Sequence, residues 1–221
     1  MCFIKSSLYK QYVWIYFMLF LAIWCMREFW FIQYLDILDG VPRAIVSAVI
    51  KISIWVIPVF IVVKMVEQKN PLSYLGLRDN IGKGLKWAAG GSFLLILYFW
   101  GVNLLVFKNN MDFQIGFNEL LNTILLVGLI EEIVFRGFIL RKLLDSFRFW
   151  VANVVTAFLF VSIHFPIWIY NGLFVFPSVL GGIVTAFVLG ILFGIIYKKS
   201  GSLWSVVIIH SMYNFLVSIF Y

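Results

Sequence analysis

The sequence predicts an all-α membrane protein: a polytopic transmembrane helical bundle with about seven spans and a cytoplasmic N-terminus. Of its 221 residues, 63% are hydrophobic and only 12% are charged, and the mean hydropathy is +1.02. Soluble domains carry about 25% charged residues. Apolar stretches near the length that crosses a bilayer recur along the whole chain. The length favours one compact bundle over two separate domains.

Seven apolar stretches are each close to the length of a transmembrane helix. The first is the least regular, because Arg27 and Glu28 interrupt it. It also lacks a cleavage site of small residues, so we interpret it as an uncleaved span and not as a signal peptide. The predicted spans cover residues 12–34, 44–66, 85–107, 118–141, 150–170, 176–197 and 202–221.

The basic residues predict the orientation of these spans. With a cytoplasmic N-terminus, thirteen of the 17 Lys and Arg residues fall on the cytoplasmic side. The opposite side keeps Arg27, Arg43 and Lys108, with Lys51 near the start of the second span. Cytoplasmic loops of membrane proteins generally carry an excess of Lys and Arg. Orientation therefore accounts for the net charge of +7, and we expect no nucleic-acid partner.

The longest polar connection, residues 70–78, divides the chain into two predicted parts. Residues 1–70 hold two spans with no evident chemistry. Residues 71–221 hold five spans and every unusual polar residue. The two cysteines, Cys2 and Cys25, form no CxxC pair, so they support neither a disulfide framework nor a thiolate metal site.

Two adjacent acids, Glu131 and Glu132, lie inside the fourth predicted span. Ionisable groups are costly in a bilayer, at about 2.5–3.5 kcal/mol each, so an intramembrane acid is a candidate functional group. Arg136 follows Glu132 by one helical turn and is predicted to pair with it, whereas Glu131 has Phe135 at that spacing. Glu131 is therefore the available acid. The alternative is a polar pair that only stabilises helix packing.

Both histidines of the chain, His164 and His210, also lie in apolar spans. A buried histidine often serves packing alone, but imidazole is the side chain best suited to proton transfer near neutral pH. Asn214 lies four residues after His210 and projects from the same helix face. An amide and an imidazole together supply donors for a developing oxyanion. For Asn214 alone, an interhelical packing bond is the alternative.

These polar groups are predicted to share a depth in the membrane. Glu131 lies about 15 Å along its helix from the basic flank at Arg141, and His210 about 16 Å from Lys199. His164 lies at the same depth if its span begins near Asn153, because the distance from that residue along the helix is also about 16 Å.

The motifs EEIVFRG, FVSIH and HSMYN, in this order on three apolar spans, resemble the EExxxRG, FxxxH and HxxxN motifs of the CPBP intramembrane proteases. This family is also called the CAAX prenyl endopeptidase type II or Abi family. The resemblance covers residues 118–221, and LGLR at 75–78 is a weaker family-like feature. It implies a multi-pass protein of the bacterial plasma membrane, in contact with lipid.

The resemblance also implies roles for the site residues. Glu131 would activate a water with help from His164, and His210 and Asn214 would stabilise the oxyanion. The supporting residues would be Glu132, Arg136, Phe135 and Phe160. Family naming allows zinc, for which Glu131, His164 and His210 are the candidate ligands. We favour a metal-free mechanism, because Asn214 beside His210 suits an oxyanion site better than a ligand set.

The expected substrate is a small hydrophobic or lipidated peptide tail, cleaved near its C-terminus. CAAX processing, bacteriocin maturation and self-immunity are all functions found in the family. A non-catalytic bacteriocin-immunity or scaffold protein is the main alternative. A transporter with a proton relay is a weaker one, because the polar groups cluster at one depth and no inverted repeat is visible.

Overall fold

The structure, a computed structural model, describes residues 2–108 and 111–220. Regular structure in these residues is entirely helical, with no β-strand among them, as the sequence predicts. The α-helices are α1 (Cys2–Met26), α2 (Ile32–Leu35), α3 (Gly40–Met65), α4 (Pro71–Tyr74), α5 (Ile81–Val102), α6 (Phe117–Glu119), α7 (Leu126–Glu132), α8 (Arg141–Leu143), α9 (Phe149–Ser162), α10 (Phe165–Tyr170), α11 (Ser178–Ser200) and α12 (Leu203–Phe220). The π-helical segments are η1 (Arg27–Phe31), η2 (Asn103–Phe107), η3 (Leu120–Leu125) and η4 (Ile133–Leu140).

Six helices of the described chain are long and apolar enough to cross a membrane. A seventh helical run extends without a break from α6 through η3, α7 and η4 to α8, and it carries the two adjacent glutamates near its middle. The six apolar helices make the chain an integral multi-pass membrane protein, and with the seventh run they are approximately consistent with the prediction of about seven spans. The six apolar helices are Tyr12–Leu35, Gly40–Met65, Ile81–Phe107, Phe149–Tyr170, Ser178–Ser200 and Leu203–Phe220. The cytoplasmic position of the N-terminus stays a prediction.

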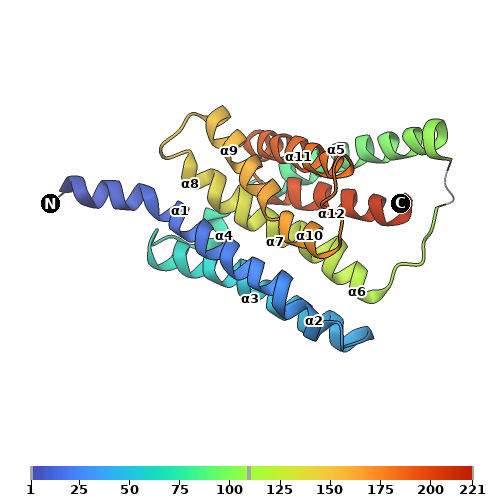
Figure 1. Cartoon of the computed structure of the whole chain (residues 1–221). Helices are drawn as coiled ribbons and strands as arrows, with labels where there is room; N and C mark the ends of the chain where they lie inside the picture. Colours follow the sequence, from blue (N-terminus) through green and yellow to red (C-terminus); the bar gives the residue numbers. More distant parts are fainter. Residues whose placement is uncertain (1, 109–110, 221) are drawn as a thin grey trace.

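Helix α12 packs against α5 and α7, while α11 packs against α9 (Figure 1). Glycines permit the close contacts. A Cβ atom added at Gly128 of α7 would lie 2.4 Å from Ser211 Oγ and 2.9 Å from the Ser211 backbone nitrogen of α12. Small residues at such crossings are how transmembrane helices bring their backbones together. The acids of α7 and the polar residues of α12 are thereby held on adjacent, closely packed helices.

An aromatic cluster joins the first two spans to the rest of the bundle. Trp55 of α3 is 1% exposed and packs edge-on against Phe20 and Trp24 of α1, at ring-centroid distances of 4.7 and 4.9 Å. Trp24 Nε1 also donates a hydrogen bond of 3.1 Å to the carbonyl of Ile163. This carbonyl directly precedes His164, so α1 contacts the backbone at one of the candidate site residues.

The fifth predicted span, 150–170, is broken where a continuous helix was expected. Helix α9 ends at Ser162, and α10 starts at Phe165 with Pro166 in its first turn. Proline lacks a backbone N–H and its ring clashes with the preceding turn of a helix, so it favours a helix start. His164 lies in the break between the two helices, as the residue before α10.

The polar connection that divides the chain is tightly packed against later helices. Asn70 caps α4, because its side-chain oxygen accepts hydrogen bonds from the backbone N–H groups of Leu72 and Ser73. The start of α12 then returns to this segment: Leu203 N donates to the Gly76 carbonyl at 2.8 Å, and Trp204 Nε1 to the Leu77 carbonyl at 2.9 Å. The division into residues 1–70 and 71–221 stays a prediction.

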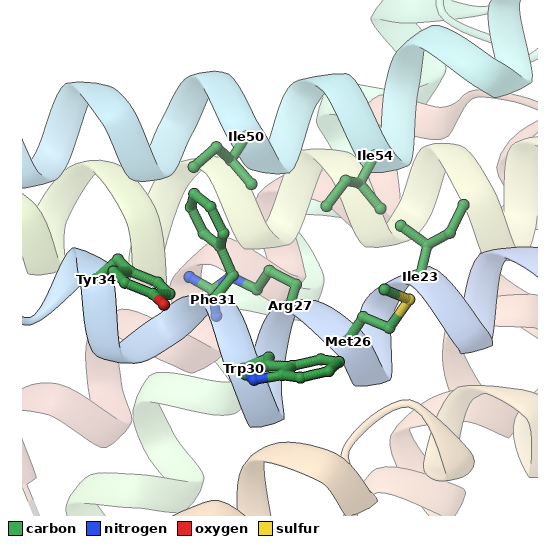
Figure 2. A pocket seen from close by; sticks show the side chains of 8 residues that line it. All are labelled: Ile23, Met26, Arg27, Trp30, Phe31, Tyr34, Ile50 and Ile54. Atoms are coloured by element: carbon green, nitrogen blue, oxygen red, sulfur yellow. The ribbon is translucent and has the colours of Figure 1, made fainter.

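A groove of about 500 Å³ lies between the first two spans, and Figure 2 shows the side chains that line it. Among its lining residues, Arg27 is the one that carries a charge, and the others are apolar or aromatic. Arg27 belongs to the π-helical turn η1 and forms an ion pair with the buried Glu28. The full lining consists of Ile23, Met26, Arg27, Trp30, Phe31, Tyr34, Ile50 and Ile54.

Candidate active site

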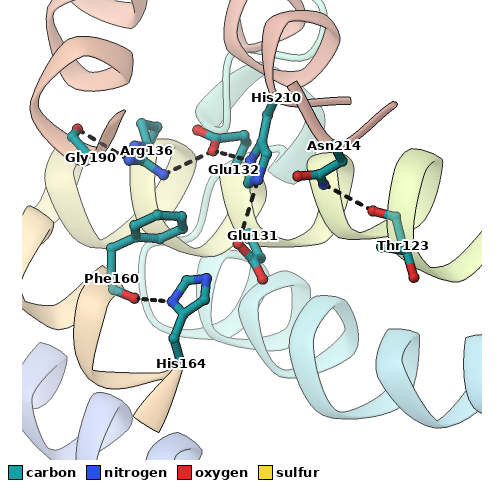
Figure 3. A network of polar contacts seen from close by, with 9 residues as sticks. All are labelled: Thr123, Glu131, Glu132, Arg136, Phe160, His164, Gly190, His210 and Asn214. Atoms are coloured by element: carbon teal, nitrogen blue, oxygen red, sulfur yellow. Dashed lines mark hydrogen bonds and ion pairs between the residues drawn. The ribbon is translucent and has the colours of Figure 1, made fainter. Parts of the chain in front are cut away.

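One cavity of about 410 Å³ brings together the four residues that the sequence predicts to be catalytic. Glu131 reaches it from α7, His164 from the break between α9 and α10, and His210 and Asn214 from α12 (Figure 3). These residues are separated by as many as 83 positions in the sequence (214 minus 131). The shared membrane depth that their spacing predicts is therefore accompanied by a shared cavity.

Glu132 is the centre of a buried polar network. Its Oε1 atom lies 2.9 Å from Arg136 Nη1, and the side chains of both residues have 0% exposure. The same oxygen lies 2.9 Å from His210 Nδ1. The pair with Arg136 was predicted from its spacing, whereas the contact with His210 was not. Glu132 thus connects the helix of the acids to the helix of the HxxxN motif.

Arg136 is fixed by α11 as well as by Glu132. Its Nη2 donates a hydrogen bond of 3.1 Å to the Gly190 carbonyl, and its guanidinium carbon lies 4.5 Å from the ring centroid of Phe160 and 5.3 Å from that of Phe193. A buried cation held by a carboxylate, a carbonyl and two aromatic faces has little freedom to move. The Arg136 side chain therefore holds Glu132 rigidly.

Glu131 differs from Glu132 in having a carboxylate that faces the cavity. Its Oε2 lies 3.9 Å from His210 Nε2, beyond hydrogen-bond distance. Within the part of the chain that the structure describes, this oxygen has no hydrogen-bond partner. The side chain is nevertheless only 9% exposed. This matches the expectation that Glu131 is the available acid and Glu132 the paired one.

Hydrogen bonds define the tautomers of the two histidines. His164 Nδ1 lies 2.8 Å from the Phe160 carbonyl, which only accepts, so Nδ1 carries the proton. In the neutral ring, His164 Nε2 then has a free lone pair. His210 Nδ1 likewise faces the carboxylate of Glu132, an acceptor when ionised. Its Nε2 is the nitrogen directed at Glu131.

Asn214 is oriented by a backbone carbonyl of the helical run that carries the acids. Its Nδ2 donates a hydrogen bond of 2.9 Å to the Thr123 carbonyl (Figure 3). An amide nitrogen has two N–H donors, so one donor remains for a ligand in the cavity.

The two phenylalanines that we expected to shape the site occupy different positions. Phe160 lines the cavity and packs against both histidine rings, with centroids 5.0 Å from His164 and 6.0 Å from His210. Phe135 is fully buried behind it, at 5.2 Å edge-on, and does not line the cavity. Phe135 supports the site only through Phe160.

Sequence reasoning missed the contribution of α11, which supplies Gly190 and Phe193. The spacing of Gly190 and Gly194 was an available signal, because small residues four apart mark close helix contacts. A Cβ at Gly190 would lie 2.9 Å from Ala157 Cβ, and one at Gly194 would lie 1.8 Å from Asn153 Oδ1. This packing brings the Gly190 carbonyl within reach of Arg136.

A metal site was the open alternative for Glu131, His164 and His210. Over residues 2–108 and 111–220, no three His, Cys, Asp or Glu side chains are arranged to hold one metal ion. Glu132 contacts Arg136 and His210, so its carboxylate belongs to a buried hydrogen-bond network and not to a metal site. Because the donors do not converge, we derive no step through a metal.

Comparison with known proteins agrees with this geometry. The family model of the Rce1-like type II CAAX prenyl endopeptidases matches residues 114–216, which include all four candidate catalytic residues. No curated protein and no solved structure matches the chain significantly. The matched family supports an endopeptidase activity, that of a hydrolase acting on peptide bonds. This match, over a little under half of the chain, supports the resemblance to the CPBP intramembrane proteases.

Proposed function

We propose that the chain is an intramembrane endopeptidase in which Glu131 activates the attacking water. The observation that carries this proposal is the difference between the two adjacent acids. Glu132 Oε1 is paired with Arg136 and His210 and Glu132 does not line the cavity, whereas Glu131 lines the cavity and forms no hydrogen bond through its Oε2 among the described residues. A carboxylate in this position is suited to take a proton from water.

The proposed reaction begins when Glu131 takes one proton from a water in the cavity. The water oxygen attacks the carbonyl carbon of the scissile peptide bond, and the carbonyl oxygen becomes an oxyanion. When this intermediate collapses, the carbon–nitrogen bond breaks, and the leaving nitrogen takes up the proton that Glu131 holds. His164, whose Nε2 has a free lone pair in the neutral ring, assists Glu131 in orienting the water.

The oxyanion is proposed to be stabilised from α12. Asn214 contributes the N–H group that Thr123 leaves free. His210 contributes its Nε2 in the protonated ring, whose positive charge the carboxylate of Glu132 stabilises through Nδ1. Preorganised donors of this kind lower the barrier because they need no reorganisation during the reaction.

The substrate that we propose is a hydrophobic or lipidated peptide tail. The cavity lies among the membrane-spanning helices, and apolar side chains such as Val127, Leu189 and Val217 line it beside the polar groups. The family match favours the C-terminal tail of a prenylated CAAX protein. A bacteriocin precursor is the alternative substrate, and a non-catalytic immunity or scaffold role is the alternative to proteolysis.

The test uses the purified protein in lipid nanodiscs with a farnesylated CAAX peptide and the same peptide without the lipid. We expect release of the C-terminal tripeptide, measured by mass spectrometry, from the farnesylated peptide. Glu131→Gln should lower the rate by about 100-fold or more, as loss of a general base does, and His164→Ala and His210→Ala should also lower it. Glu119→Gln, in the same helical run but outside the cavity, is the matched control.

Each outcome of this test decides between the alternatives. A folded Glu131→Gln protein that cleaves as fast as wild type would overturn the mechanism. Absence of cleavage of both peptides and of a bacteriocin precursor by folded wild type would favour the non-catalytic role.

A further inference from the structure

Lys51 is a charged residue of the membrane-spanning part that the proposed mechanism does not use. It lies in α3, outside the residues that the family model matches. Its Nζ donates a hydrogen bond of 2.8 Å to the backbone carbonyl of Asn122, and the side chain is half-buried. A lysine in the membrane is costly and generally has a specific partner and role.

The acceptor belongs to the π-helical turn η3, nine residues before Glu131 in the same helical run. The carbonyl of the next residue, Thr123, accepts the hydrogen bond of Asn214. Lys51 and Asn214, which are far apart in the sequence, therefore donate hydrogen bonds to two consecutive carbonyls of one turn. A π-helical turn disturbs the regular hydrogen bonds of a helix and often occurs at functional sites.

A second contact ties the same turn to α3. The side chain of Asn122 donates to the Ala44 carbonyl at 2.8 Å and to Asn118 Oδ1 at 3.0 Å. Backbone groups at membrane depth have no water to bind, so such partners determine where an irregular turn lies. Helix α3 thus fixes both the backbone and the side chain of Asn122.

Lys51 also lies near other charged residues. It interacts electrostatically with Arg27, Glu28 and Glu131. Arg27 and Glu28 form an ion pair with each other, so their charges largely offset one another.

We propose that Lys51 is a positioning residue for the active site. It holds the turn η3 through the Asn122 carbonyl and keeps the following turns oriented so that Glu131 faces the cavity. This inference rests on the proposed function, because it assigns the rate of the Glu131 reaction partly to the second span. The N-terminal spans then contribute to turnover as well as to packing.

The test compares Lys51→Met, which keeps the length of the side chain but removes the donor and the charge, with Lys51→Arg, which retains both. Lys64→Met, at an exposed position in the last turn of the same helix, is the matched control. We expect Lys51→Met to lower kcat about tenfold or more, with KM within about twofold of wild type because Lys51 does not line the cavity. Lys51→Arg should recover most of kcat, and Lys64→Met should behave as wild type.

A folded Lys51→Met protein with the kcat of wild type would overturn the inference, and so would a loss of kcat that Lys51→Arg does not recover. If Lys51→Met yields no folded protein, Lys51→Leu, which also lacks a donor and a charge, is judged by the same kcat and KM criteria. Failure of both variants to fold would assign Lys51 to folding and also overturn its positioning role.

Glu131→Gln, assayed in parallel, separates this inference from the proposed function. If Glu131→Gln remains active, the proposed function is wrong, whatever Lys51→Met does. If Glu131→Gln is inactive while folded Lys51→Met keeps full kcat, only the role of Lys51 is wrong.

Discussion

His210 Nδ1 and Glu132 Oε1 lie 2.9 Å apart, which joins α12 to α7 across 78 residues of sequence. Because Arg136 holds the same carboxylate oxygen at 2.9 Å, the imidazole of His210 is attached to a group that cannot readily move. The second acid of the pair therefore orients a residue that we propose to contact the oxyanion, in addition to balancing the charge of Arg136.

Replacement of Glu132 by glutamine is expected to reduce both stability and turnover. The variant leaves the buried guanidinium of Arg136 without a countercharge, and breaking a buried ion pair costs about 3–5 kcal/mol. It also removes the negative charge that stabilises a protonated His210. Thermal unfolding in detergent and the cleavage rate should both fall, while Glu119→Gln changes neither. Normal stability together with full activity in Glu132→Gln would remove the supporting role of Glu132.

Asn214→Ala is expected to lower kcat by roughly 100-fold, the usual effect of removing one oxyanion-hole donor. KM should change little, because the lost hydrogen bond forms mainly in the transition state. Steady-state kinetics on the lipidated peptide measures the two constants separately. Ser218→Ala, one turn further along α12, is the control. A large rise in KM at constant kcat would instead assign Asn214 to substrate binding.

Metal removal is expected to leave the activity unchanged, since the described acids and histidines do not converge on one point. Elemental analysis of the purified enzyme should find well below one zinc ion per chain. A chelator should alter the cleavage rate by less than about twofold, whereas disturbed metal sites typically lose activity by about 10- to 100-fold. Stoichiometric zinc, with activity lost to the chelator and restored by zinc alone, would contradict the metal-free mechanism.

Gly128→Ala is expected to disturb the contact between the two helices that carry the site. The added Cβ would lie 2.9 Å from the backbone nitrogen of Ser211, so α7 and α12 would have to separate. We expect a lower melting temperature and a lower kcat. At Gly90 of α5 a Cβ meets nothing within 4 Å, and Gly90→Ala should be neutral or slightly stabilising because alanine favours helix. Equal behaviour of the two variants would mean that the close approach at Gly128 is unimportant.

The sequence predicted the features of this protein that depend on local composition and spacing. Hydropathy located the spans to within about four residues, because the bilayer imposes both length and polarity on each helix. The pairing of Glu132 with Arg136 followed from the helical repeat alone. The same spacing left Glu131 without a partner in its own helix, which is why it was predicted to be the available acid.

Features that depend on contacts between distant helices could not be predicted in this way. The hydrogen bonds of Trp24 to the Ile163 carbonyl and of Lys51 to the Asn122 carbonyl join residues 139 and 71 positions apart. Nothing in the local sequence around either residue indicates its distant partner. The break at His164 could have been predicted more readily, because Pro166 marks a helix start. The motif FVSIH was instead treated as part of one continuous helix.

The π-helical turn η3 also determines the rotational orientation of α7, the helix that follows it. Each α-helical residue advances the helix by about 100°, so one residue gained or lost within Leu120–Leu125 would rotate Glu131 by that angle relative to Asn118. The carboxylate would then point at a neighbouring helix, although every motif residue was still present. Relatives with intact motifs but a single-residue gap in this turn are therefore expected to be pseudoenzymes.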